Sequence, residues 1–225
     1  MRVATFNVEN LDEREDAPTL EERIEILRPQ LERIDADILC LQEVHGQERE
    51  GQPRQLHALS LLLSGTKYGG WNLAHTKTSK GEAYDKRNLV IVSKYPILEF
   101  DQVRNSLVDD LRYRRITAIP EETEPKDVSW ERPILRAKIG HPDGEIYVLT
   151  VHLKSRIPTT IPGQKEDFAY KSVNGWAEGY FISSMKRVGQ ALELRMMIDE
   201  ILDNDPKSKI IVCGDFNAYP GEVPV

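Results

Sequence analysis

Four short apolar runs, each ending in polar residues, constrain the fold of this chain more than any other feature. They occupy residues 3–7, 38–43, 147–152 and 210–217. Runs of five or six β-branched and large apolar residues are typical of strands buried on both faces of a sheet. We therefore expect their polar ends, at Asn7, Glu43, His152 and Asp215, to emerge together with Asn217 where a sheet meets solvent.

Length and composition favour one acidic α/β domain. With 225 residues, of which 40% are hydrophobic, the chain can bury one sizeable core, and we expect residues 1–225 to form a single domain. The formal net charge of −7 provides no global field that would attract nucleic acid. A polyanionic partner would therefore need a local basic groove or bound cations.

The two cysteines and the N-terminal sequence suggest a reducing compartment. Cys40 and Cys213 both lie inside apolar runs, where they are expected to act as small hydrophobic residues rather than as a disulfide or a zinc site. Met1 and Arg2 lead directly into a strand, and no apolar stretch approaches 18 residues. We expect a cytoplasmic protein with no membrane-spanning segment and no obligate protein partner.

Helix signals occur in three places. Thr19 and Glu22 form a capping-box pattern ahead of a helix with three-four apolar spacing, which Pro29 should kink or split. Residues 54–64 predict a second helix with leucines 56, 59 and 63 facing inward. Apolar residues at 182, 185, 189, 192 and 196 predict a long amphipathic helix over about 178–202.

Further strands are predicted at residues 71–76, 88–93, 97–103 and 134–139. The sequence His-Pro-Asp-Gly at 141–144 has the chemistry of a hairpin turn, so the strands on either side of it should be antiparallel neighbours. Strands and helices alternate throughout, which predicts mixed sheets covered by helices.

The polar strand ends carry chemistry suited to a metal ion and a phosphate. Glu43 and Asp215 offer the carboxylate oxygens that Mg²⁺ prefers, while Asn7, His152 and Asn217 offer hydrogen-bond donors. Lys154 follows His152 at strand spacing and would add an ammonium group. Each residue alone is explained more simply as a solvated strand end, a cap or an Asx turn, so the interpretation depends on all of them occurring in one chain.

Five segments resemble the endonuclease/exonuclease/phosphatase superfamily, which has the DNase I-like fold. They are TFNVEN (5–10), DADILCLQEV (35–44), NLVIVSKYPI (88–97), LTVHLKS (149–155) and VCGDFNAYP (212–220). The resemblance implies a four-layered α/β sandwich, with two mixed sheets face to face and helices outside. It also implies hydrolysis of a phosphodiester, most simply by a nuclease or phosphodiesterase, with Mg²⁺ that Mn²⁺ could replace.

The resemblance assigns a role to each matching residue. Glu43 is similar to the principal Mg²⁺ ligand, with Asn7 beside it on the metal or phosphate. His152 resembles the histidine that contacts phosphoryl oxygens, and Asp215 the carboxylate that orients water and approaches the metal. Asn217 is similar to a phosphate-binding asparagine. Lys154 and Arg187 lie at positions that are often basic in bacterial relatives.

One departure from the family pattern concerns the region after residue 220. The superfamily continues with two strands and a Ser-Asp-His motif that completes its catalytic centre, and this motif is not present in the 225 residues. We therefore expect a domain that lacks its last strands. A degenerate relative that binds a phosphorylated ligand without cleaving it is the alternative function.

The substrate stays open among DNA, RNA, a phosphoinositide, a sphingolipid head group and a small phosphodiester. Basic and aromatic residues alternate through the loop at 156–176, which includes Lys165, Phe168, Tyr170, Lys171 and Trp176. Such a mixture could stack on nucleobases and contact phosphates, although packing of the aromatic rings on the domain is the simpler explanation. Arginines 112, 114 and 115 form a second basic cluster that would serve a phosphate or form a solvated face.

The departure at the C-terminal end predicts a difference in activity. Loss of a general base usually lowers turnover by several orders of magnitude. We expect the 225-residue chain to hydrolyse bis(4-nitrophenyl) phosphate much more slowly than a longer parent that carries the Asp and His, each assayed with Mg²⁺ or Mn²⁺. Equal steady-state rates would contradict this expectation.

Overall fold

The computed structural model describes residues 1–13, 17–219 and 221–222. The elements are β1 (Val3–Leu11), α1 (Leu20–Ile34), β2 (Ile38–Val44), β3 (Gln47–Arg49), β4 (Gln52–Gln55), α2 (His57–Leu63), β5 (Asn72–His75), β6 (Asn88–Ser93), β7 (Ile97–Val103), β8 (Leu111–Tyr113), β9 (Lys126–Val128), β10 (Ile134–His141), β11 (Gly144–His152), β12 (Lys165–Glu166), β13 (Ala169–Tyr170), α3 (Val173–Asn204) and β14 (Lys209–Asp215).

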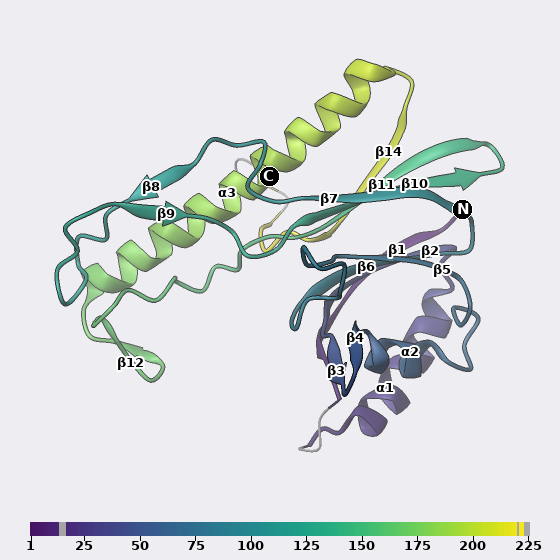
Figure 1. The fold of residues 1–225 in the computed structure, drawn as a ribbon, viewed down its shortest axis with the longest axis horizontal. Coiled ribbons are helices and arrows are strands. Elements are labelled where there is room, and N and C mark those ends of the chain that lie inside the picture. Colours follow the sequence, from purple (N-terminus) through teal and green to yellow (C-terminus); the bar gives the residue numbers. More distant parts are fainter. Residues whose placement is uncertain (14–16, 220, 223–225) are drawn as a thin grey trace. The chain divides into compact units, whose positions relative to one another are not determined.

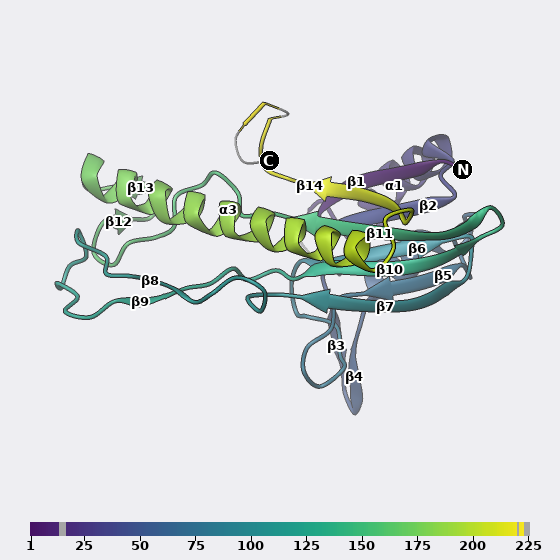
Figure 2. The same cartoon turned by 90° about the horizontal axis from the view of Figure 1, so that it is seen from above.

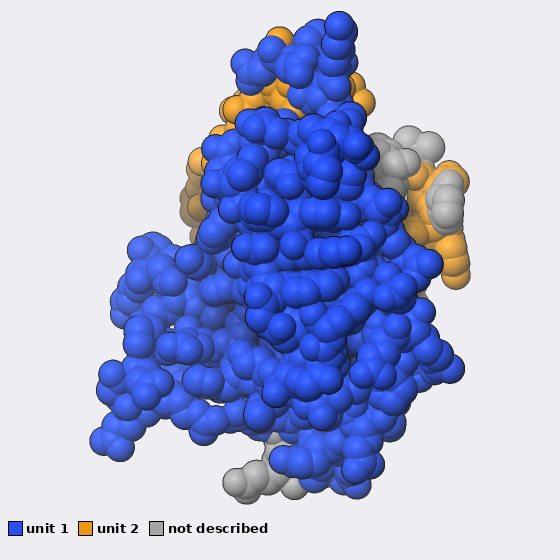
Figure 3. Space-filling model, turned by 90° about the vertical axis from the view of Figure 1, so that its right-hand side faces the viewer, with its two compact units in different colours: residues 1–102, 134–152, 204–215 blue, residues 103–133, 153–203, 216–225 orange. Residues whose placement is uncertain are grey.

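The chain divides into two compact units, which Figure 3 shows in different colours. The first unit consists of Met1–Gln102, Ile134–His152 and Asn204–Asp215. The second consists of Val103–Pro133, Leu153–Asp203 and Phe216–Val225.

Two mixed four-stranded sheets form the framework of the first unit (Figures 1 and 2). In the sheet ordered β1-β2-β6-β5, β1 runs parallel to β2, and β6 runs antiparallel to both β2 and β5. In the sheet ordered β14-β11-β10-β7, β11 runs parallel to β14 and antiparallel to β10. The hairpin predicted at residues 141–144 is confirmed, because His141 and Gly144 close the β10–β11 pair.

The core of the first unit follows from the alternation of side chains along its central strands. From β2, Leu39 and Leu41 point into an apolar cluster that also contains residues of α1 and α2. Ile38 and Cys40, on the other face of the same strand, enter a cluster with residues of β10 and β11 from the second sheet. The predicted burial of this run on both faces is therefore confirmed, with helices on one side and a second sheet on the other.

The strands at the sheet edges are less buried than predicted. In β14 six of the seven residues are half-buried and one is exposed, and in β1 only Val8 and Leu11 are fully buried. Both strands have a hydrogen-bonded neighbour on one side only within the described sheets, which accounts for the difference.

The first helix begins where the sequence indicates, whereas the second begins later. Thr19 accepts a hydrogen bond from the Glu22 amide, and the Glu22 side chain bonds back to the Thr19 amide, so the capping box is confirmed. Helix α1 continues through Pro29 without being split. Helix α2 begins at His57, because Arg54 and Gln55 belong to β4, and the predicted start at residue 54 is wrong. Among the described residues, no helix combines the length and apolar composition required of a bilayer-spanning segment.

The long helix of the second unit follows the predicted apolar face only in part, since Ile182 and Gly189 are buried as expected. Leu192 and Met196 are exposed, whereas Glu193 is fully buried. The Glu193 carboxylate accepts bonds from the Trp130 indole at 2.9 Å and from the backbone amides of Asn105 at 3.1 Å and Ser106 at 2.8 Å. A buried carboxylate with this many donors is well satisfied, so polar residues replace apolar ones on the inner face.

Gly214 permits close contact between β14 and β11. Its φ of +139° lies in a region that side-chain-bearing residues rarely adopt. A Cβ at this position would overlap the backbone nitrogen, carbonyl carbon and oxygen of Val151, which cannot move without breaking the strand pairing.

Replacing Gly214 with Ala is therefore expected to lower the free energy of unfolding by more than about 3 kcal/mol, since backbone strain and overlap both contribute. Gly81 supplies the matched control, because its φ is +82° but nothing lies near a built Cβ. Gly81→Ala should cost only about 1 kcal/mol. Urea unfolding of both variants provides the measurement, and similar losses would show that the overlap at Gly214 is unimportant.

Candidate active site

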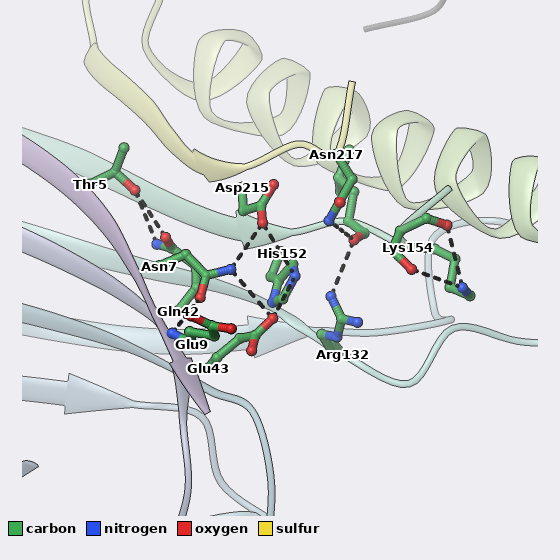
Figure 4. Close-up of polar contacts among 12 residues, drawn as sticks. Thr5, Asn7, Glu9, Gln42, Glu43, Arg132, His152, Lys154, Asp215 and Asn217 are labelled. Carbon is green, nitrogen blue, oxygen red and sulfur yellow. Dashed lines mark hydrogen bonds and ion pairs between the residues drawn. The ribbon is translucent and has the colours of Figure 1, made fainter. Parts of the chain in front are cut away.

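Four of the residues predicted from the strand ends converge in the first unit (Figure 4). The Asn7 amide nitrogen lies 3.3 Å from Glu43 Oε1 and 3.0 Å from Asp215 Oδ2. His152 Nε2 lies 3.5 Å from each of the same two oxygens. One amide and one imidazole therefore hold the same pair of carboxylate oxygens.

Strand direction explains this convergence. The parallel register of β1 and β2 places Asn7 opposite Gln42, next to Glu43. The parallel register of β11 and β14 places His152 directly opposite Asp215. Because the carboxyl ends of parallel strands meet at one edge of a sheet, each pair delivers its polar residues together.

Asn7 and Glu43 were predicted to end their strands, but both lie before the strand ends, next to an irregular stretch of backbone. β1 continues to Leu11 and β2 to Val44, with a shift of register between Asn7 and Leu11. Glu9, Asn10 and Glu43 have φ values of +47°, +52° and +64°. Residues in this left-handed region are uncommon and concentrate at functional sites, where the fold keeps the strained conformation in place.

A polar network behind Glu43 supports its second oxygen. The Asn10 backbone amide donates to Glu43 Oε2 at 3.1 Å. The Asn10 side chain contacts His45 Nε2 at 3.2 Å, and His45 Nδ1 lies 3.2 Å from Asp12 Oδ2. Sequence reasoning missed this network, because a histidine and an aspartate in a loop give no signal of what they contact.

The Asp12 carboxyl is shifted toward its charged form. Burial alone would raise the pKa of this group, but hydrogen bonds from Gln47 and His45 outweigh burial and lower the pKa below its usual 3.8. Asp12 thus stays a hydrogen-bond acceptor for His45. His45 in turn contacts the Asn10 side chain, and the Asn10 backbone amide donates to Glu43.

Gln42 supplies a second support that the sequence did not single out. Its side-chain nitrogen donates to Thr5 Oγ1 at 3.1 Å and to Thr150 Oγ1 at 3.2 Å. Gln42 and Thr150 are buried, and they come from different sheets. This contact joins β2 to β11 just behind the residues that converge.

The donor set fits a hard divalent cation. Within the described part of the chain, no group of three or more His, Cys, Asp and Glu side chains is arranged to hold a metal ion. Mg²⁺, however, is usually held by one or two carboxylates and several waters. Glu43 and Asp215 meet that need, and the Asn7 oxygen, which accepts from the Glu9 amide at 2.9 Å, faces the backbone instead.

The other three predicted site residues lie in the second unit. The Asn217 amide donates to the Leu153 carbonyl at 3.0 Å, and Arg187 Nη1 donates to the Lys154 carbonyl at 3.3 Å. The Lys154 amide donates to Gln190 Oε1 at 2.7 Å. β11 ends at His152, so the strand alternation that was expected to align Lys154 with His152 does not continue that far.

Lys154 and Arg187 lie near two further cations, Arg132 and Lys186, which the sequence did not indicate. Arg132, which is 9% exposed, donates to the Leu153 carbonyl at 3.2 Å. Burial lowers the pKa of Lys154, and the nearby Arg132, Lys186 and Arg187 add to that effect, while Glu131 opposes it. Like charges gathered in this way favour binding of an anion.

The second predicted basic cluster is neutralised by its neighbours. Arg112 pairs with Asp127, Arg114 with Glu121 and Arg115 with Glu122. The Arg115 and Lys126 side chains lower the pKa of Glu122 to about 2. These three arginines therefore form a solvated, ion-paired face and not a phosphate site.

Comparison with known proteins identifies the family. The model of the Endonuclease/Exonuclease/phosphatase family matches residues 4–225. The chain belongs to that family, whose members hydrolyse phosphoric esters. No curated protein matches the chain.

Solved structures share the fold at low identity. TDP2 from Caenorhabditis elegans is 16% identical with a TM-score of 0.56, and the match covers 96% of this chain and 48% of that one. A mannosyl-6-phosphatase from Bacteroides thetaiotaomicron is 15% identical with a TM-score of 0.59, covering 98% and 67%. D. rerio TDP2, solved with a single-strand DNA product, is 16% identical with a TM-score of 0.53, covering 96% and 60%.

These likenesses confirm the predicted DNase I-like α/β fold. This chain spans about half the length of the C. elegans structure.

The Asp12 network predicts a pH effect. A carboxyl whose pKa is lowered by folding contributes stability above its unfolded pKa, and that stability is lost as pH falls through the folded pKa. Urea unfolding should therefore show that Asp12→Asn costs about 1 kcal/mol or less at pH 6, and less still near pH 3.5. A cost that does not change with pH would show that the charge of Asp12 is unimportant.

Proposed function

We propose that this protein is a Mg²⁺-dependent phosphodiesterase, most simply a nuclease, that cleaves by in-line attack of water on phosphorus. The convergence of Glu43, Asp215, Asn7 and His152 carries the proposal. Membership of the family supports the class of reaction. The DNA product held by D. rerio TDP2 supports the choice of a nucleic-acid strand as substrate.

The cation would be held between Glu43 and Asp215. Two carboxylate oxygens that share their donors repel each other, and this repulsion is relieved when a cation binds. A bound Mg²⁺ would offset the negative charge that grows on the phosphoryl oxygens. Mn²⁺ has similar ligand preferences and should replace it.

The chain's own residues supply orientation and hydrogen bonds. Asp215, 31% exposed in its side chain, is open enough to accept a hydrogen bond from the attacking water and so to orient it. His152 and Asn7 present nitrogen donors beside the same oxygens, where they would contact phosphoryl oxygens as charge develops. Asn217, Lys154 and Arg187 are proposed to bind phosphate groups of the substrate.

The alternative is a protein that binds a phosphorylated ligand without cleaving it. The strained backbone at Glu9, Asn10 and Glu43 favours the enzyme, because strain of this kind is retained where geometry is used.

Substitution of either carboxylate tests the proposal. Glu43→Gln and Asp215→Asn keep the shape of the side chain but remove its charge. We expect each to abolish the rise in unfolding temperature that Mg²⁺ or Mn²⁺ produces, because the cation loses a ligand. Hydrolysis of bis(4-nitrophenyl) phosphate, followed with protein in excess so that slow turnover is seen, should fall by roughly 100-fold or more.

Glu145→Gln is the matched control. Glu145 pairs with Lys138 on the hairpin between β10 and β11, and its side chain is 56% exposed. The substitution should leave both the metal-dependent rise in unfolding temperature and the rate of hydrolysis unchanged. Stabilisation by metal without any hydrolysis in the unsubstituted protein would identify a binding protein, and hydrolysis that survives both carboxylate substitutions would contradict the proposal.

A further inference from the structure

The second unit contains an open pocket of about 540 Å³ at the start of its long helix. Its walls come from the hairpin β12–β13, from the first turn of α3 and from the segment that precedes the hairpin; the first two lie side by side in Figures 1 and 2. The pocket is lined by Ile157, Pro158, Lys165, Phe168, Tyr170 and Trp176, among others.

Aromatic rings line this pocket, and two of them are exposed to solvent. Phe168 is 97% exposed and Trp176 is 47% exposed. The simpler sequence interpretation, in which these rings pack on the domain, is therefore wrong for Phe168. Large apolar side chains left in water in this way mark interaction surfaces when they gather at a concave site.

Two of the rings are held in fixed orientations. Trp176 stacks on Tyr180 with ring centroids 5.6 Å apart and an angle of 14° between planes. The Tyr170 hydroxyl donates to the carbonyl of Pro158 at 3.0 Å. Rings that are ordered before a ligand arrives lose little conformational entropy on binding.

Positive charge adjoins the aromatic walls. The Lys165 ammonium lies 5.9 Å from the centre of the Tyr170 ring. The Lys154 ammonium donates to the carbonyl of Ile157 at 3.0 Å, and Ile157 is itself part of the pocket wall. Lys154 therefore adjoins the pocket wall at Ile157, while Arg132 and Arg187 are buried and bond to the carbonyls of Leu153 and Lys154.

We propose that this pocket is a subsite for single-stranded nucleic acid, in which a base stacks on Phe168 and Trp176 while a neighbouring phosphate contacts Lys165 and Lys154. Aromatic platforms beside a cationic track are the usual means of holding unpaired strands. The choice of a phosphodiester strand as ligand rests on the proposed function.

Charge on the hairpin argues against a lipid surface as the ligand. Glu166 and Asp167 immediately precede Phe168 at the tip between β12 and β13. Insertion of Phe168 into a bilayer would bring both carboxylates into the head-group layer, where anionic lipids repel them.

The test measures binding in EDTA, which prevents metal-dependent cleavage, by the anisotropy of a short fluorescein-labelled oligothymidylate. Phe168→Ala and Trp176→Ala should each weaken binding by roughly 5- to 100-fold, the range that loss of one stacking ring produces. Phe168→Trp keeps a stacking ring and should bind oligothymidylate about as tightly as the unsubstituted protein. Phe100→Ala is the matched control, because Phe100 is a 40% exposed phenylalanine in the first unit, and it should have no effect.

An abasic strand of the same length distinguishes binding through the base from binding through the phosphate. It should bind the unsubstituted protein about as weakly as oligothymidylate binds Phe168→Ala, and Phe168→Ala should not weaken it further. Equal binding of the two strands by the unsubstituted protein would overturn the proposal. So would sedimentation with phosphatidylcholine–phosphatidylserine vesicles that is lost in Phe168→Ala.

The outcome is distinguishable from failure of the proposed function. Loss of oligothymidylate binding in Phe168→Ala supports the subsite even if bis(4-nitrophenyl) phosphate is not hydrolysed. Hydrolysis of that small substrate with unchanged oligothymidylate binding in both alanine variants would overturn the subsite and leave the hydrolase standing. Thermal unfolding of Phe168→Ala should match that of the unsubstituted protein, because so exposed a ring stabilises the fold very little.

Discussion

The Asn7 amide joins the two sheets of the first unit at the point where negative charge is concentrated. It donates to carboxylate oxygens of Glu43 and Asp215, which can lie no more than about 6 Å apart because each is within 3.3 Å of one nitrogen. Two unit charges at that separation repel by about 3 kcal/mol in a partly buried setting. Asn7 and His152 offset part of this repulsion, and a cation would offset the remainder.

The local signals in the sequence were strong wherever one segment decides its own structure. The capping box at Thr19, the hairpin at residues 141–144 and the buried run at β2 all form as expected, because each depends on contacts within a few residues or on simple alternation. The helix start at residue 54 was wrong because pairing of β4 with β3 outcompeted helix propensity. Tertiary contacts decide such cases, and a single sequence does not display them.

Prediction of the site had the same limit. Polar residues at the ends of apolar runs indicated Asn7, Glu43, His152 and Asp215, which the structure brings together. Nothing in the spacing indicated Asn10, His45 or Gln42, since their roles depend on a bulge and on sheet-to-sheet packing. On α3, Glu193 took an inner position that an apolar periodicity assigns to leucine, because Trp130 and backbone amides satisfy its charge.

The distance in sequence between the partners of the Asn7 amide has a consequence for protein synthesis. Asn7 and Asp215 are 208 residues apart, and β14 is the last of the described strands in the sequence. A nascent chain that has not yet extended beyond β11 contains Asn7, Glu43 and His152 but lacks the second carboxylate. The pair of carboxylates is therefore complete only when nearly all of the described chain has been synthesised.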